Sequence, residues 1–427
     1  MYFQRLTKGD YARALALIGA MLVSGCGGGF GLSSASPPRP TLNLSTLGIG
    51  DDSTYFETGF ENNLFEESGF VELNGEPRVI RGKISGDDDV DVYDLGPVSR
   101  GMRIVVEITA AESLNGALAL FDDTGASLLV NDHRNAYLGR KDPFVNVVIR
   151  RDSDACYVAV SATPGYNALG TYAMLASKES PVPIPSVRPD TVLLIFNGGT
   201  NVQIGQRRPL TISSFDPVDI DERFGGDASS MIREIVSRVR EDYAGLNVTI
   251  LSTSEGSRYD GSMTRIFFGA YDAALLGVAD GVDEFNSTQA QEAIIFTDTF
   301  AAFSRLEPSV LQMSRAIANV TSHEIGHLLG LVHTKDSKGI MDVTASLNQL
   351  LVDQDFRMSP LYTDVFPIGW QNALQLLVDA VGGDVDPTAV KGFGDAGPSP
   401  KSFDDAGGPS ARESLLLSTC GLGDHAG

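Results

Sequence analysis

The pattern of apolar and polar positions divides the chain into two regions with different periods. From about 71 to 175, short apolar runs rich in β-branched residues alternate with Gly, Asp and Asn turns, and the turn at 122–125 is the clearest hairpin signal. Runs of this length and spacing predict antiparallel strands packed as an all-β sandwich. The expected strands are 90–95, 104–108, 117–121, 146–149 and 157–160.

Beyond residue 190, strand-like runs alternate with amphipathic helical periods. Such alternation predicts a layered α/β domain. The expected strands are 192–196, 248–251, 266–268 and 294–296, and the expected helices are 228–246, 309–327 and 369–381. Gly382 and Gly383 are expected to end the last helix, because glycine accepts the backbone conformations that follow a helix.

Linker-like segments separate these regions. Repeated prolines at 181–185 remove backbone donors and stiffen the chain, so we place the boundary between the two folded regions there. Segments rich in Gly, Ser and Pro near both ends are too poor in apolar side chains to order themselves. The sequence therefore predicts a leader over 1–25, a tether over 26–50, the sandwich over 51–180, a linker over 181–189, the α/β domain over 190–383 and a disordered tail over 384–427.

The leader has the charge and hydropathy pattern of an export signal. Three basic residues precede the apolar stretch 14–23, which is too short to span a membrane as a mature helix. The run Leu22-Val23-Ser24-Gly25-Cys26 that follows resembles the lipobox of bacterial lipoproteins. The resemblance implies a lipid on Cys26 that anchors the protein to the cell envelope, at the outer membrane if the cell is Gram-negative. Plain secretion is the alternative.

Composition narrows the classes of partner. With 55 acidic and 32 basic residues the net charge is −23, so phosphate backbones are repelled and nucleic acid is not expected as a partner. Carboxylates also bind Ca2+, and the acidic run 87–94 permits either a structural calcium site or a solvated turn. The three cysteines lie far apart with no CxxC spacing, which leaves a pairing of Cys156 with Cys420 open.

The frame His-Glu-x-x-His-x-x-Gly-x-x-His carries the candidate chemistry. His323 and His327 lie four positions apart on an expected helix and share one face, where both can bind one metal ion, with Glu324 beside them. Gly330 can adopt a positive φ and turn the chain back, so that His333 becomes a third ligand. Three histidines leave the fourth position of Zn2+ open to water, which is the arrangement of a catalytic site, and Glu324 is then the general base.

This frame resembles the motif of the metzincin clan of metallopeptidases, over about 190–381. The resemblance implies a mixed sheet, a zinc-bearing active-site helix, one catalytic Zn2+ and peptide substrates that pair with an exposed edge strand. The candidate for this edge strand is the run 275–279, for which a loop is the alternative. It also implies a methionine in a tight turn beneath the metal, for which Met341 in 339–342 is the candidate. Val343 stands where astacin-like members carry a tyrosine, and Thr334 matches no familiar subfamily, so the subfamily stays open.

The sandwich region resembles the bacterial pre-peptidase C-terminal domain, a jelly-roll-like β-sandwich, on the runs 89–93, 119–122 and 170–172. That family accompanies secreted peptidases and usually follows the catalytic domain, whereas here it comes first. We therefore predict a multidomain, exported zinc endopeptidase that acts on extracellular or envelope proteins.

Two other functions stay open at this point: a surface-anchored adhesion or binding protein that contains zinc without turnover, and zinc-dependent hydrolysis of a non-peptide amide. The intact Glu324 favours an enzyme, because a scaffold needs the ligands but not the base. The natural substrate, any latency control and the oligomeric state cannot be read from these residues.

Overall fold

The fold was taken from a computed structural model, which describes residues 54–57, 62–73, 75, 77–86, 88–110, 114–132, 142–163 and 169–388. The predictions for the leader, for Cys26, for the pairing with Cys420, for the tether and for the tail beyond 388 lie outside these residues. Within the described part of the chain, no helix is long and apolar enough to cross a membrane.

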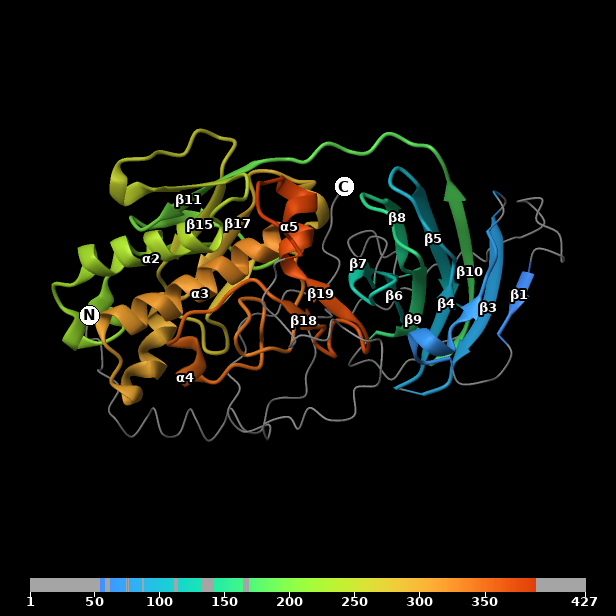
Figure 1. Cartoon of the computed structure of the whole chain (residues 1–427). Helices are drawn as coiled ribbons and strands as arrows, with labels where there is room; N and C mark the ends of the chain where they lie inside the picture. The colour runs from blue at the N-terminus through green and yellow to red at the C-terminus, as the bar shows by residue number, and fades with distance from the viewer. Residues whose placement is uncertain are drawn as a thin grey trace. The chain divides into compact units, whose positions relative to one another are not determined.

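Residues 54–179 form two five-stranded sheets (Figure 1). The strands are β1 Thr54–Phe56, β2 Gly69–Phe70, β3 Arg78–Ile84, β4 Val90–Asp94, β5 Arg103–Ala110, β6 Gly116–Asp122, β7 Ser127–Asn131, β8 Phe144–Val148, β9 Cys156–Ala162 and β10 Gly170–Glu179, with one 3-10 turn at Phe65–Glu67. Their orders are β1-β3-β10-β5-β8 and β2-β4-β9-β6-β7. Ile80, Val106 and Met174 of the first sheet share one buried core with Leu118 and Val158 of the second, so the two sheets form a sandwich.

Strand direction differs in part from the antiparallel prediction. β1 pairs with β3, and β2 with β4, in parallel, whereas the other described pairs of the sandwich are antiparallel. The predicted hairpin turn joins β6 to β7. In this turn Asp122 Oδ1 accepts hydrogen bonds from the backbone N–H groups of Thr124 and Ala126, each with an N···O distance of 3.0 Å. Gly125 in that turn has φ +77°, a conformation that favours glycine.

Two aspartates of the acidic run accept hydrogen bonds from residues close to them in the chain. Asp89 accepts bonds from the N–H and hydroxyl of Ser85, and Asp94 accepts one from Gly96 N over 2.7 Å. Asp91 instead points into the sandwich, where Tyr172 OH donates to it over 2.6 Å and burial raises its pKa to about 8. The calcium site therefore remains a sequence-based expectation.

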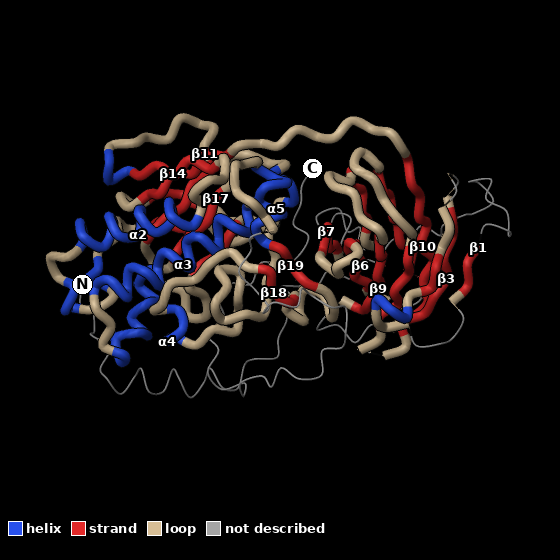
Figure 2. The backbone as a smooth tube through the Cα atoms, viewed as in Figure 1, coloured by secondary structure: helices blue, strands red, loops and turns tan. Residues whose placement is uncertain are grey.

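The second region contains a mixed sheet with helices packed on one face (Figure 2). Its strands are β11 Asp190–Ile195, β12 Gly199–Val202, β13 Leu210–Ile212, β14 Val248–Ser252, β15 Thr264–Phe268, β16 Gly277–Ala279, β17 Glu292–Ile295, β18 Met358–Pro360 and β19 Trp370–Asn372. Its helices are α2 Ala228–Asp242, α3 Val310–Leu328, α4 Leu347–Leu350 and α5 Ala373–Val381. The 3-10 helices are Pro217–Asp219, Glu222–Phe224, Thr253–Glu255, Glu284–Asn286 and Thr297–Leu306.

The main sheet has the order β14-β11-β15-β17-β16. The first four strands are parallel and β16 is antiparallel to β17, so the sheet is mixed, as predicted. The candidate edge strand 275–279 is present as the shorter β16 at the end of the sheet order, but its residues are buried, whereas an exposed edge was expected. One face of the sheet buries Leu194 and Ile266 against α2 and α3. The other face buries Phe267 and Ile294 against the β12–β13 hairpin.

The helix that carries the motif begins and ends where the sequence predicts. Ser309 caps α3, with a reciprocal pair in which its hydroxyl accepts a bond from Gln312 N and the Gln312 side chain accepts one from Ser309 N. From Met313 onward the helix is almost entirely buried, which suits a rigid carrier for a site.

Two other helices are shorter than predicted. α2 ends at Asp242 rather than at 246, because Gly245 turns the chain with φ +81° toward β14. α5 begins at Ala373 rather than at 369, because residues 370–372 pair with β18 and the Asn372 side chain caps the helix by accepting a bond from Gln375 N.

Candidate metal centre

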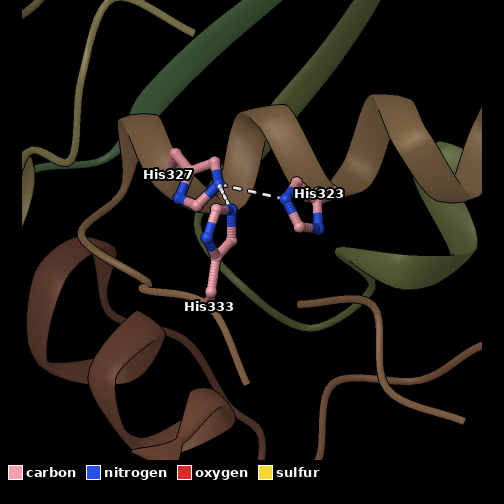
Figure 3. A group of neighbouring side chains, drawn as sticks. All are labelled: His323, His327 and His333. Carbon is pink, nitrogen blue, oxygen red and sulfur yellow. Dashed lines mark hydrogen bonds between the residues drawn. The ribbon is translucent and has the colours of Figure 1, made fainter. Parts of the chain in front are cut away.

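Three histidine side chains converge at the C-terminal end of α3 (Figure 3). His323 and His327 project from successive turns of the helix, and His333 reaches them from the segment that follows it. The Nε2 atom of His327 lies 3.0 Å from Nε2 of His323 and 3.1 Å from Nε2 of His333. His323 and His327 are buried, and His333 is buried or half-buried.

The other ring nitrogens decide what these short distances mean. Nδ1 of His323 donates to Ile340 O over 2.7 Å, and Nδ1 of His327 donates to Leu331 O over 2.8 Å. In a neutral imidazole the second nitrogen then carries a lone pair, so two lone pairs face each other. A cation between them removes this repulsion. Zinc–nitrogen bonds of about 2.0–2.1 Å at tetrahedral angles separate ligand atoms by about 3.3 Å, close to the spacing found here.

The electrostatics of the site keep the rings in the form that binds metal. Burial lowers the pKa of His323 to about 4. Burial, together with repulsion from the neighbouring rings, lowers the pKa of His327 and His333 well below the ordinary value. All three rings are therefore neutral at pH 7, as metal coordination requires.

Glu324 lies one residue from the first histidine and is fully buried. Neither of its carboxylate oxygens has a hydrogen-bond partner among the described residues. Burial raises its pKa well above the ordinary value, and the positive charge of Arg207 opposes that shift. A divalent cation at the histidines favours the ionised carboxylate in the same way. The carboxylate is thus available to a water molecule at the site.

Gly277 on β16 makes room for this carboxylate. A Cβ atom at that position would lie 2.8 Å from Cγ of Glu324 and 2.9 Å from Cδ. This contact could not be predicted from sequence, because residue 277 lies far from the motif along the chain. Strand β16 and the Glu324 side chain are therefore in direct contact.

If Glu324 takes part in metal-assisted hydrolysis of a peptide, Gly277→Ala is expected to lower kcat/KM about 100-fold without loss of the metal, because a displacement of about 1 Å in a reacting group has an effect of that size. Zinc content and peptide cleavage, measured on the same preparation, check this. Gly116→Ala is the matched control, since a Cβ there meets its neighbours at 3.6 Å or more. Equal activity of wild type and Gly277→Ala contradicts the assignment of this contact.

Met341 lies in the predicted turn beneath the histidines. Asp342 N donates to Gly339 O over 3.1 Å, which closes the turn, and Met341 is 2% exposed. A Cβ atom at Gly326 would lie 2.6 Å from the sulfur of Met341. The thioether therefore packs against the helix between the first two histidines, as an apolar floor rather than as a ligand.

Gly330 forms the predicted turn after the helix. Its φ is +97°, and its N–H donates to His327 O over 2.9 Å. A Cβ atom there would lie 3.0 Å from Cα of Glu284 and 3.1 Å from Asp283 O. Conformation and space thus both require glycine at this position.

Asp342, which the sequence reading did not single out as a functional residue, joins the segments on either side of the methionine turn. It is fully buried and accepts bonds from Asp336 N over 2.8 Å and from Thr344 N over 3.0 Å. Burial raises its pKa to about 6, and these hydrogen bonds oppose the shift. From sequence alone, an aspartate after the turn does not indicate this role, because its hydrogen-bond partners are brought to it only by the fold.

One known protein family matches the part of the chain that contains the three histidines. Residues 252–359, which contain β16, α3, the three histidines and the methionine turn, match the family model described as Matrixin. This match covers less than half of the chain. The sequence matches no curated protein.

Solved structures give distant likenesses. The pre-peptidase C-terminal domain of a collagenase from Bacillus anthracis is 18% identical over 26% of this chain and 94% of that chain, with a TM-score of 0.20. An archaemetzincin from Methanopyrus kandleri is 14% identical over 44% of this chain and 93% of that chain, with a TM-score of 0.24.

Proposed function

We propose that the protein is a zinc-dependent endopeptidase, with His323, His327 and His333 as the metal ligands and Glu324 as the general base. The observation that carries this proposal is that Nε2 of His327 lies 3.0 Å from Nε2 of His323 and 3.1 Å from Nε2 of His333, while the next residue after His323 is a buried glutamate whose oxygens have no partner in the described structure. Three protein ligands leave room for water and substrate, which is typical of catalytic rather than structural zinc. The Matrixin match over the same residues supports it.

When bound, zinc supplies Lewis-acid polarisation of the peptide carbonyl. The side chain of Glu324 takes a proton from the attacking water as the oxygen–carbon bond forms. The carbon–nitrogen bond then breaks, and the same carboxyl group gives the proton to the leaving amine, so the base is regenerated. The close packing of Gly277 against the Glu324 side chain keeps the carboxylate in place during both proton transfers.

The candidate partner for the substrate backbone is strand β16, whose three residues are buried in this structure. It lies at the end of the sheet order, and its Gly277 packs against Glu324. We infer that an extended peptide pairs with this edge, because strand addition presents a backbone carbonyl without reading the side chains. Selection among sequences then depends on side-chain pockets.

We also propose that the protein is exported and anchored to the envelope by a lipid on Cys26, on the strength of the sequence alone. Incorporation of a labelled fatty acid into the wild type but not into Cys26→Ser tests this. Label in both proteins, or in neither, rejects the anchor.

The activity is tested by purifying the protein from residue 27 onward, measuring bound metal and following cleavage of an unfolded protein by mass spectrometry. Zinc-dependent cleavage within the polypeptide supports the endopeptidase. Stoichiometric zinc without cleavage of any of a broad set of unfolded proteins favours the binding protein instead. Absence of metal after zinc is supplied rejects both.

A further inference from the structure

The segment that carries the third histidine is held by hydrogen bonds at both ends. At its start, Leu331 N donates to Gly326 O over 2.9 Å, and Leu331 O accepts the bond from His327 Nδ1 over 2.8 Å. At its end, Thr334 N donates to Met341 O over 2.9 Å. Backbone groups of the helix and of the methionine turn therefore fix both ends of the segment.

Val332, immediately before His333, is held by a side chain instead. Val332 N donates to Oε1 of Gln371 over 2.8 Å, and Nε2 of Gln371 donates to Val332 O over 2.8 Å. Gln371 is fully buried. An amide that bonds both polar groups of one residue imitates strand pairing, so it fixes that residue's position and the direction of its backbone.

Gln371 is itself held in place by secondary structure. It lies on β19, paired with Ser359 of β18, and the next residue, Asn372, caps α5. Beyond β18, Tyr362 N donates to His333 O over 3.0 Å. The β18–β19 pair and the residues after it therefore contact the histidine segment at two adjacent residues.

We propose that Gln371 is a positioning residue for the third metal ligand, an inference that rests on the proposed function. Without its amide, two buried polar groups of Val332 lose their partners, and the segment gains freedom next to His333. Groups that orient a metal ligand change metal affinity although they never touch the ion or the substrate. Gln371 lies 38 positions beyond His333, so the link exists only in the fold.

The test compares zinc dissociation constants, measured by competition with a chromogenic chelator, for wild type, Gln371→Met and Gln371→Glu. Methionine keeps the length of the side chain and removes both hydrogen bonds, whereas glutamate keeps only the acceptor for Val332 N. We expect zinc to bind about 10-fold or more weakly in Gln371→Met, with Gln371→Glu also weakened.

Asn319→Leu is the matched control. The Asn319 amide is buried on α3 and donates to Leu350 O over 3.0 Å and to Val352 O over 2.8 Å, so it braces a segment that carries no ligand. We expect its zinc affinity to stay within about 2-fold of wild type.

Unchanged affinity in Gln371→Met, or an equal loss in Asn319→Leu, overturns the inference. If Gln371→Met fails to fold, Gln371→Glu decides, and wild-type affinity in that variant overturns the inference. Wild-type protein that binds no zinc overturns the proposed function first, which separates the two failures.

Discussion

Glu324→Gln is expected to keep its zinc and to lose about 1,000-fold in kcat, within the range that a general base supplies. The amide has the same shape as the carboxylate, so the fit against Gly277 is preserved. It cannot accept the proton of the attacking water at neutral pH. Zinc content by mass spectrometry and cleavage of an unfolded protein are measured on the same preparations.

Glu255→Gln is the control for this substitution, because Glu255 is a half-exposed partner of Arg240 on the surface. We expect it to cleave at the wild-type rate. A Glu324→Gln protein that contains zinc and still cleaves at the wild-type rate removes Glu324 from the reaction. Loss of zinc together with activity assigns Glu324 to the metal site's structure rather than to proton transfer.

The local part of the site could be predicted from sequence because its geometry follows from one helix. Spacing by four positions places His323 and His327 on one face of α3, and the helix start follows from the cap at Ser309. Gly330 and Met341 lie close in sequence to these residues, and their roles follow from a positive φ and from an apolar side chain in a turn. The spacing of residues within the frame is therefore enough to predict the local geometry of the site.

The supporting residues could not be predicted, because their contacts join distant parts of the chain. Gly277 meets Glu324 only through the placement of β16 beside α3. The sequence predicts a helix over 369–381, which includes Gln371. The later start of α5 comes from strand pairing and from the cap at Asn372, both of which depend on β18. Long-range pairing overrides local periodicity at such boundaries.

Removal of zinc is expected to lower the melting temperature of the wild-type protein by about 5 °C or more. A ligand that binds only the folded state at 100 times its dissociation constant stabilises that state by about 2.7 kcal/mol. In a unit of 150–250 residues each kcal/mol corresponds to about 2–4 °C. The loss is large here because the Nδ1 bonds to Ile340 O and Leu331 O hold the rings in place, so the facing lone pairs cannot turn away.

The measurement is thermal unfolding with and without a chelator that selects zinc over calcium, for wild type and for His327→Ala. His327 is the ligand whose Nε2 contacts both of the others, so its loss dismantles the group. With zinc present, we expect the variant to have a lower melting temperature than the wild type. We also expect the chelator to leave the variant's melting temperature unchanged. If the wild type loses all its zinc without a change in melting temperature, the expected repulsion between the facing lone pairs of the zinc-free histidines is contradicted. A fall on removal of calcium alone assigns the stability to a calcium site instead, and separates the two cations that the sequence suggested.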